Sequence, residues 1–224
     1  MRDLFNKCTE NLFNSLTDGE ILKVTFYGED SQFIRINNAK IRQSGYVEDA
    51  DITVTLIKDS KTCSRTFTIT NNKEDNQNIS LNVLNEMRSE VRQLPKDKYI
   101  VEPQKTGSTE DVSHCDLLPH DEVIDALLPV MQGVDLVGIW ASGRMYRGSA
   151  NSLGLNHWFE TDSYSLDYSL VTPNHQMVKG TFSGREWNQK KYEDYINNSK
   201  KKSELLNRKP VKVSPGEYRV WFEP

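Results

Sequence analysis

The side chains best suited to recognise a ligand are gathered in residues 144–160. This stretch offers cationic, amide, hydroxyl, imidazole and carboxylate groups in close succession: Arg144, Arg147, Asn151, Ser152, His157 and Glu160. An arginine near an amide can hold a peptide backbone or a carboxylate, as in recognition by strand addition. We therefore name these six residues as candidates for a peptide groove. The alternative interpretation is a bulged strand end whose arginines pair with Glu160 or Asp162.

The spacings that characterise metal and catalytic sites do not occur in this sequence. None of the four histidines forms a His-x-x-x-His or His-Glu-x-x-His pair, which would place two zinc ligands one turn apart on a helix. His114 and Cys115 adjoin each other, and His120 is nearby, but no partner follows at a ligand spacing. No Gly-x-Ser-x-Gly or phosphate-binding glycine loop is present. We assign no catalytic residue, metal or cofactor to this chain.

Strand and aromatic patterns surround these candidates. Residues 164–170 alternate between apolar and polar side chains, which predicts a strand with one buried and one wet face. Asp162 and Asp167 are five residues apart and would face opposite sides of such a strand, which argues against a paired acid and base. We expect three tryptophans of this region to anchor the core or a subunit interface. They are Trp140, Trp158 and Trp187.

Amphipathic helices and short strands make up the predicted fold. Apolar residues at helical spacing predict helices over residues 4–16, 79–94, 121–131 and 189–206. Short strands predict antiparallel pairing over residues 21–27, 33–36, 41–46, 51–57 and 63–70, with a last strand over 217–222. Polar turns are expected at residues 28–31, 37–38 and 58–61, and residues 96–118 are expected to be irregular. We expect an α+β fold in which amphipathic helices pack on one face of an antiparallel sheet. The expected divisions are a subdomain over 1–102, a linker over 103–118, a central block over 119–209 and the start of a carboxy-terminal domain over 210–224.

The composition indicates a polar protein of a reducing compartment. The 224 residues carry 28 basic and 32 acidic side chains, a net charge of −4, and the mean hydropathy is −0.66. This balance provides no basic footprint, so direct nucleic-acid binding is not expected. Three widely spaced cysteines form no Cys-x-x-Cys pair, and the sequence shows neither a signal peptide nor an apolar run of membrane-spanning length. We expect a cytoplasmic protein.

Several segments resemble the TldD/PmbA family, whose members are also called modulators of DNA gyrase. The most specific are Arg147-Gly-Ser-Ala-Asn-Ser-Leu-Gly154, Asn156-His-Trp-Phe-Glu160 and residues 163–170. Residues 35–45 resemble the family's amino-terminal strand pair, and residues 214–220 resemble the opening of its carboxy-terminal half. The resemblance extends over nearly the whole chain, although residues 174–179 do not match the corresponding turn of the family.

The resemblance implies a function for which this chain holds only part of the machinery. In the family, a TldD-type subunit hydrolyses peptides with a zinc ion held by a His-Glu-x-x-x-His helix in the carboxy-terminal half. That motif is absent here, and the chain stops at Pro224, where that half would begin. The resemblance thus implies the amino-terminal, non-catalytic domain of a zinc metallopeptidase subunit. Such a domain would shape a peptide-access chamber and form a homo- or heterodimer with a TldD/TldE-like subunit.

Two alternatives stay open from the sequence. The chain could belong to a metal-free TldE/PmbA-type partner subunit, or it could be a stand-alone protein-interaction module of the gyrase-modulator kind with no peptidase role. In the peptidase interpretations the expected partner is a peptide or an unfolded protein, and zinc is expected only in the missing carboxy-terminal half. The motif that would separate the two subunit types lies in that half.

Overall fold

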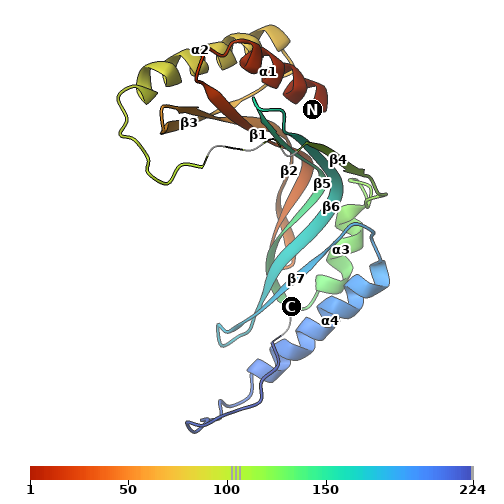
Figure 1. Cartoon of the computed structure of the whole chain (residues 1–224). Coiled ribbons are helices and arrows are strands. Elements are labelled where there is room, and N and C mark those ends of the chain that lie inside the picture. The colour runs from red at the N-terminus through yellow and green to blue at the C-terminus, as the bar shows by residue number, and fades with distance from the viewer. Residues whose placement is uncertain (102, 104, 106, 223–224) are drawn as a thin grey trace.

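The computed structural model describes residues 1–101, 103, 105 and 107–222, and in this part of the chain seven strands form one sheet (Figure 1). Their order across the sheet is β3-β2-β1-β5-β6-β4, and β7 pairs with a different part of β6 from β4. The strands are β1 (Ile21–Asn37), β2 (Lys40–Lys58), β3 (Lys61–Thr68), β4 (Ser108–Ser113), β5 (Asp135–Asn151), β6 (Asn156–Val171) and β7 (Met177–Gly184).

The strands are longer than the sequence predicts. β1 and β2 contain 17 and 19 residues and pair along their length, so the turn expected at residues 28–31 does not form. Gly28 instead lies opposite Ala50 of β2 and Tyr146 of β5. That prediction was wrong because a strand with a neighbour on each side satisfies both rows of its backbone hydrogen-bonding groups, which outweighs the turn preference of Gly28 and Asp30.

Tight turns join consecutive strands at the other expected places. Asn38 and Ala39 have φ angles of 52° and 51°, and Asp59 and Ser60 have φ angles of 52° and 58°. Positive φ at both central residues is typical of the type I′ turn, whose twist matches the twist of the flanking antiparallel strands. The turns predicted near residues 37–38 and 58–61 are therefore confirmed.

The ladder between β1 and β5 joins the two halves of the sheet. It runs without a register shift from Lys23 opposite Asn151 to Ile36 opposite Gly138. Midway along it the two backbones approach closely, because a Cβ atom added to Gly143 would lie 2.2 Å from the carbonyl oxygen of Asp30. Only glycine fits this position without moving one of the strands.

The strand β4 lies in the segment predicted as a linker, residues 103–118. It pairs in parallel with β6, whereas the other ladders of the described sheet are antiparallel. Its serine, glutamate and aspartate residues have low strand propensity, so no local pattern predicts it. The prediction of irregular structure here was wrong because the free edge of β6 supplies the pairing. Gln104 and Thr106 of the predicted linker lie outside the described residues.

Helices cover the two ends of the sheet (Figure 1). The helices of the described chain are α1 (Arg2–Asn14), α2 (Lys73–Val91), α3 (Val123–Met131) and α4 (Gln189–Leu206). Figure 1 shows α1 and α2 together at one end of the long strands and α3 and α4 together towards the other. None of these four helices is long and apolar enough to cross a membrane.

All four helices pack on the same face of the sheet. In β1 the residues Leu22, Val24 and Phe26 belong to the cluster of buried residues that contains α1 and α2. Ile34 and Ile36 belong to the cluster that contains α3 and α4. These five numbers are all even, and because side chains of a strand alternate between its faces, both clusters lie on one face. The predicted α+β fold, with amphipathic helices on one face of the sheet, is confirmed.

The two clusters, which we call the first core (under α1 and α2) and the second core (under α3 and α4), mix residues from distant parts of the chain. Ile34 and Ile36 precede residue 102 but are buried in the second core. Ala150 and Trp158 lie within residues 119–209 but are buried in the first core. The predicted units 1–102 and 119–209 therefore each complete the core of the other, because β1, β5 and β6 pass through both.

The segment after α4 forms neither helix nor strand over residues 208–222. The strand predicted over residues 217–222 does not form, and Trp221 and Phe222 are each 85% exposed. Alternating apolar residues stay extended as a strand only when a neighbouring strand pairs with them, and none does so in the described chain. Glu223 and Pro224, also expected to begin a further domain, lie outside the described residues.

A buried ion pair connects the start of β1 with α2. The carboxylate of Glu20 is 1% exposed and accepts hydrogen bonds from Arg88 Nη2 at 2.8 Å and from the Thr17 amide at 2.9 Å. Arg88 also donates to the Ser15 carbonyl oxygen at 2.6 Å, at the end of α1. Burial alone would raise the pKa of Glu20, but the bonds from Arg88 and Thr17 and the charge of Arg88 lower this pKa from 4.5 to about 2.

We expect this pair to make the protein sensitive to acid. A carboxyl whose pKa is lowered by folding stabilises the native state above its unfolded pKa and loses that contribution as the pH falls towards its folded pKa. Between pH about 4.5 and about 2, Glu20 should therefore account for about 2–3 kcal/mol of lost unfolding free energy. Urea unfolding at a series of pH values measures this. Glu20→Gln should lower stability at neutral pH and flatten the acid slope, and parallel curves for the variant and the wild type would contradict the assignment.

Candidate functional site

A belt of polar side chains crosses the helix-bearing face between the two cores. This polar belt consists of Gln32 of β1, Ser142 and Arg144 of β5, Glu160 and Asp162 of β6, and His114, which follows β4. Gln32 lies opposite Ser142, and Arg144 lies opposite Asp162 in the strand register. The five strand residues have even numbers and therefore share the face that carries the cores.

Asp162 is the centre of the polar belt. Its carboxylate, 7% exposed, accepts a hydrogen bond from Arg144 Nε at 2.8 Å and one from the Cys115 amide at 3.2 Å. His114 Nδ1 lies 3.2 Å from the same carboxylate. Burial would raise the pKa of Asp162, but the bonds from Arg144, Cys115 and His114 and the charge of Arg144 hold this pKa below its ordinary value. Asp162 is thus a buried acceptor that fixes three groups.

Glu160 forms the second, looser acidic position of the belt. Its Oε1 lies 3.7 Å from Arg144 Nε and 3.5 Å from His114 Nε2. Its Oε2 accepts a hydrogen bond from the indole of Trp158 at 3.3 Å. His114 therefore touches both carboxylates through its two ring nitrogens, and Arg144 does so through its guanidinium. The pairing of an arginine with Glu160 or Asp162, expected as the alternative from the sequence, is the arrangement that Arg144 adopts.

The belt and Trp140, two residues before Ser142 in β5, contain buried groups with unused hydrogen-bonding capacity. In the described part of the chain, Gln32 Oε1, Ser142 Oγ and Trp140 Nε1 are buried without a protein partner. The amide of Gln32 meanwhile donates from Nε2 to the His120 carbonyl oxygen at 3.2 Å. Buried polar groups of this kind are commonly satisfied by ordered water. The belt is therefore a polar layer inside the fold, between two apolar ones.

Arg147 and His157 lie on the opposite face of the sheet, which carries no helix. The guanidinium of Arg147 sits 3.7 Å above the ring of Tyr27, and its Nη1 donates to the Tyr146 carbonyl oxygen at 2.7 Å. His157 Nδ1 lies 2.6 Å from Thr109 Oγ1 of β4. Because Arg144 and Arg147 are three residues apart in one strand, the pleat directs them to different faces. A single groove cannot contain both.

Asn151 and Ser152 shape the hairpin between β5 and β6. Asn151 Oδ1 accepts hydrogen bonds from the amides of Leu153 and Leu155 at 2.9 and 3.1 Å. Ser152 Oγ accepts from the Leu22 amide at 3.1 Å, which ties the hairpin to the start of β1. Both side chains also border a cavity of about 380 Å³ between α1 and the hairpin. Their side-chain oxygens hold the turn in place.

The three tryptophans are placed inside the fold. Trp158 is 4% exposed and packs between Phe5 and Phe26 in the first core, with ring centroids 5.8 and 5.5 Å away. Trp140 is fully buried in the second core, and the half-buried Trp187 meets its ring edge-on at 5.5 Å. The indole of Trp158 also donates to Glu160, so it joins the first core to the polar belt.

The chemistry available in the polar belt is binding and positioning. Cys115 Sγ donates to the Arg185 carbonyl oxygen at 2.8 Å, which occupies the thiol. Among residues 1–101, 103, 105 and 107–222, no group of three or more His, Cys, Asp and Glu side chains is arranged to hold a metal ion. The belt can hold a segment of chain in place through Asp162, which it does for His114 and Cys115. The sequence pointed to Arg144 and Glu160, but it did not associate them with residues 32, 114 and 142.

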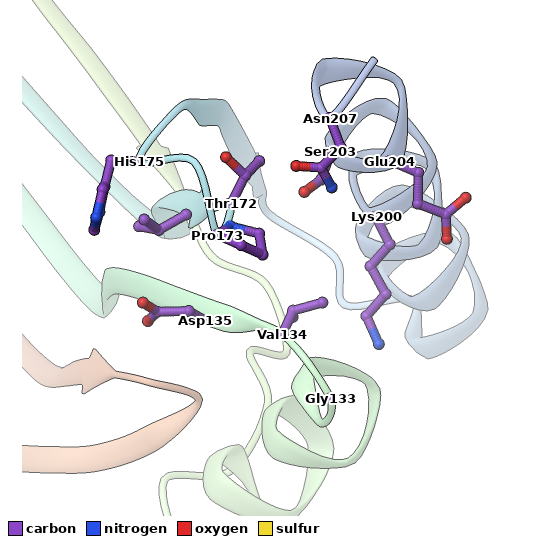
Figure 2. Close-up of a pocket in the computed structure, with 11 residues that line it drawn as sticks. Gly133, Val134, Asp135, Thr172, Pro173, His175, Lys200, Ser203, Glu204 and Asn207 are labelled. Atoms are coloured by element: carbon purple, nitrogen blue, oxygen red, sulfur yellow. The ribbon is translucent and has the colours of Figure 1, made fainter. Parts of the chain in front are cut away.

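A cavity of about 600 Å³ lies at the far end of the sheet, between α4 and the turn that joins β6 to β7 (Figure 2). Figure 2 shows Thr172 and Pro173 on this turn, Val134 below them and Glu204 on α4 pointing away from the turn. Lys200, the cationic group of its lining, donates to the carbonyl oxygen of Gln132 at 2.9 Å and thereby closes the end of α3. We assign no ligand to this cavity.

Comparison with solved structures identifies the fold. TldE from Thermococcus kodakarensis superposes with a TM-score of 0.64 at 15% identity over 88% of this chain and 47% of that one. Two proteins described as candidate modulators of DNA gyrase also match. The Thermotoga maritima protein has a TM-score of 0.59 at 14% identity over 87% of this chain and 47% of its own. The Bacteroides thetaiotaomicron protein has a TM-score of 0.61 at 13% identity over 90% and 49%.

These matches establish the fold of the chain. The chain spans about half the length of the solved structures it matches. No protein-family model matches the chain, and no curated protein sequence does so either. The resemblance that the sequence suggests is thus confirmed at the level of the fold. The sequence identities to these structures are only 13–15%.

We expect Asp162 to contribute more to stability than any other carboxylate of β6. Asp162→Asn removes the charge that pairs with Arg144 and should cost about 1–3 kcal/mol of unfolding free energy. Glu160→Gln, whose contacts are longer, should cost less than about 1 kcal/mol. Asp167→Asn on the exposed opposite face is the matched control and should change little. Urea denaturation of the three variants gives the order, and equal costs for Asp162→Asn and Asp167→Asn would remove Asp162 from the centre of the belt.

Proposed function

We propose that this chain is the amino-terminal, non-catalytic domain of a TldD/PmbA-like zinc metallopeptidase subunit. The observation that carries the proposal is the extent of the structural match, which takes in nearly nine-tenths of this chain but only about half of TldE and of the two candidate gyrase modulators. A match of this form is what one domain of a two-domain subunit produces. The activity, substrates and partners of the whole subunit are part of the proposal.

The role of such a domain is to shape the space that a peptide enters. Long strands with helices on one face leave the other face of the sheet open, and this face carries Tyr27, Arg147 and Phe159 in its half nearer the first core. A broad surface of aromatic and cationic groups suits contact with an extended or unfolded polypeptide. The zinc ion and its ligands belong to a carboxy-terminal half, and the complete enzyme is a cytoplasmic homo- or heterodimer of TldD/TldE-like subunits.

A metal-free partner subunit of the TldE/PmbA type is the second candidate. It is favoured by the match to TldE from Thermococcus kodakarensis, which has the highest TM-score of the three structures named above. A third candidate, a protein-interaction module without peptidase role, draws on the description of the other two structures as candidate modulators of DNA gyrase. All three candidates assign the chain a binding role, and they differ in what it binds.

The non-catalytic assignment predicts that the chain alone hydrolyses no peptide. The test incubates the purified chain with a fluorogenic casein substrate, with and without added zinc, beside an equal amount of heat-denatured chain. Release of fluorescence should stay at the level of the denatured control, because no zinc-binding helix is present in the sequence. Turnover that a chelator abolishes and zinc restores would overturn the proposal.

A further inference from the structure

The strand β4 lies at one edge of the described sheet. Its six residues are exposed or half-buried, and none of them belongs to the first or second core. It pairs only with β6, and this is the parallel ladder of the described sheet. Serine and acidic residues make a poor strand sequence. The backbone ladder, and not burial, therefore holds β4 in place.

Two side-chain contacts determine how β4 lies on β6. The carboxylate of Glu110 receives both terminal nitrogens of Arg2, at the start of α1, in a forked arrangement. Thr109 Oγ1 lies 2.6 Å from His157 Nδ1 on the other face of the sheet. One contact recognises a carboxylate and the other a hydroxyl, at consecutive positions of an extended chain.

The end of β4 is fastened separately by the polar belt. The Ser113 carbonyl oxygen accepts a hydrogen bond from Arg185 at 3.0 Å, and the next two residues, His114 and Cys115, are bound by Asp162. If residues 108–112 left β6, these contacts would keep the chain from Ser113 onwards attached. The opened edge of β6 would then present the unpaired backbone groups of residues 156–161.

A small cavity adjoins β4 on the edge of the sheet. Its volume is about 190 Å³, and it is lined by Arg2, Ser108, Thr109, Glu110, Asn156 and Trp158. Ser108 is the smallest side chain of this lining and lies opposite Asn156. An extended chain with a larger apolar side chain at the Ser108 position would extend into this cavity.

We infer that residues 156–161 of β6 form a strand-addition site for an extended peptide, and that Ser108–Ser113 occupies this site as an internal substitute. The bound peptide runs parallel to β6 and places a hydroxyl residue against His157 and an acidic residue, next along, against Arg2. Main-chain hydrogen bonds to β6 supply affinity, and these two contacts supply the sequence preference. The choice of a peptide as ligand rests on the proposed function, whereas the position and chemistry of the site rest on the contacts of β4.

The internal strand competes with any added peptide. A tethered segment acts at an effective concentration of about 1 mM, so a peptide with a Kd of about 100 µM for the open edge should bind the intact chain about tenfold more weakly. Replacing residues 108–112 by Gly-Ser-Gly-Ser-Gly removes the competitor and keeps the chain length. The folded state of this variant is checked by circular dichroism and by its elution volume.

The probe is a fluorescein-labelled peptide with the chain's own sequence Gly-Ser-Thr-Glu-Asp-Val-Ser, measured by fluorescence anisotropy. We expect the replaced variant to bind it at least about tenfold more tightly than the intact chain does. A peptide with leucine at the first serine should bind more tightly still. A scrambled peptide of equal composition keeps the main-chain hydrogen bonds but loses the two side-chain contacts, so it should bind more weakly. Equal affinities for the native and scrambled peptides would overturn the inference.

Two substitutions in the replaced variant assign the contacts. Arg2→Met should weaken binding of the native peptide about tenfold but leave a peptide with glutamine in place of glutamate unaffected. His157→Ala should weaken binding of the native peptide by a similar factor. It should leave unaffected the binding of a peptide in which valine replaces the threonine before the glutamate. Lys23→Met, a surface cation on β1 away from β4, is the matched control. Equal losses for all peptides and all three substitutions would contradict the proposed contacts.

Hydrogen exchange of the intact chain tests the same idea if the replaced variant does not fold. Amides of residues 109–112 should exchange at least about tenfold faster than those of the β5–β6 ladder, because they open locally. Exchange at the rate of global unfolding would show that β4 does not detach. If the intact chain elutes as a dimer that exchanges this strand between copies, a second copy is the ligand and the peptide inference falls. Peptide binding without any turnover supports this inference whatever the outcome of the peptidase assay.

Discussion

The pairing of β1 with β5 is the interaction on which the rest of the structure depends. In the described sheet, the hairpin of β1 and β2 pairs with the hairpin of β5 and β6 along this ladder. Because both strands run the full length of the sheet, their pairing builds the floor of the first core and of the second core at the same time. Loss of register here would move every apolar side chain of β1 to the open face. The glycine at position 143 protects this register, since no larger residue tolerates the approach of the Asp30 backbone.

The polar belt follows from that arrangement. A continuous strand must cross from one core to the other, and the sequence fills the crossing with Gln32, Ser142 and Arg144 in place of apolar residues. Asp162 compensates the arginine and uses its remaining acceptor capacity to hold the chain segment after β4. The same charge thus stabilises the middle of the sheet and limits how far β4 can detach. Structure and proposed binding are linked through one buried carboxylate.

Local patterns predicted the helices and the buried face well, and they failed where distant segments decide the structure. Alternation in residues 164–170 correctly placed the four apolar side chains inside, because one face of β6 is buried by helices. The turn expected at residues 28–31 and the irregular segment that contains β4 were wrong because each of them pairs with a strand more than 45 residues away, β5 in the first case and β6 in the second. The residues named as one peptide groove lie on two faces of the sheet for a simpler reason. Arg144 and Arg147 lie three residues apart in one strand, so their side chains point to opposite faces of the sheet. The sequence reveals this only if both residues are assigned to the same strand.

The long sequence separation of β1 and β5 has a consequence for synthesis on the ribosome. At about 5–20 residues per second, the roughly 100 residues between the end of β1 and the start of β5 take about 5–20 s to emerge. Throughout this interval the β1–β2 hairpin has a long free edge and an incomplete apolar face. A nascent chain in that state is a natural client for a chaperone. The delay also favours completion of the hairpin, with α1 and α2 already docked, before the second half of the sheet is added.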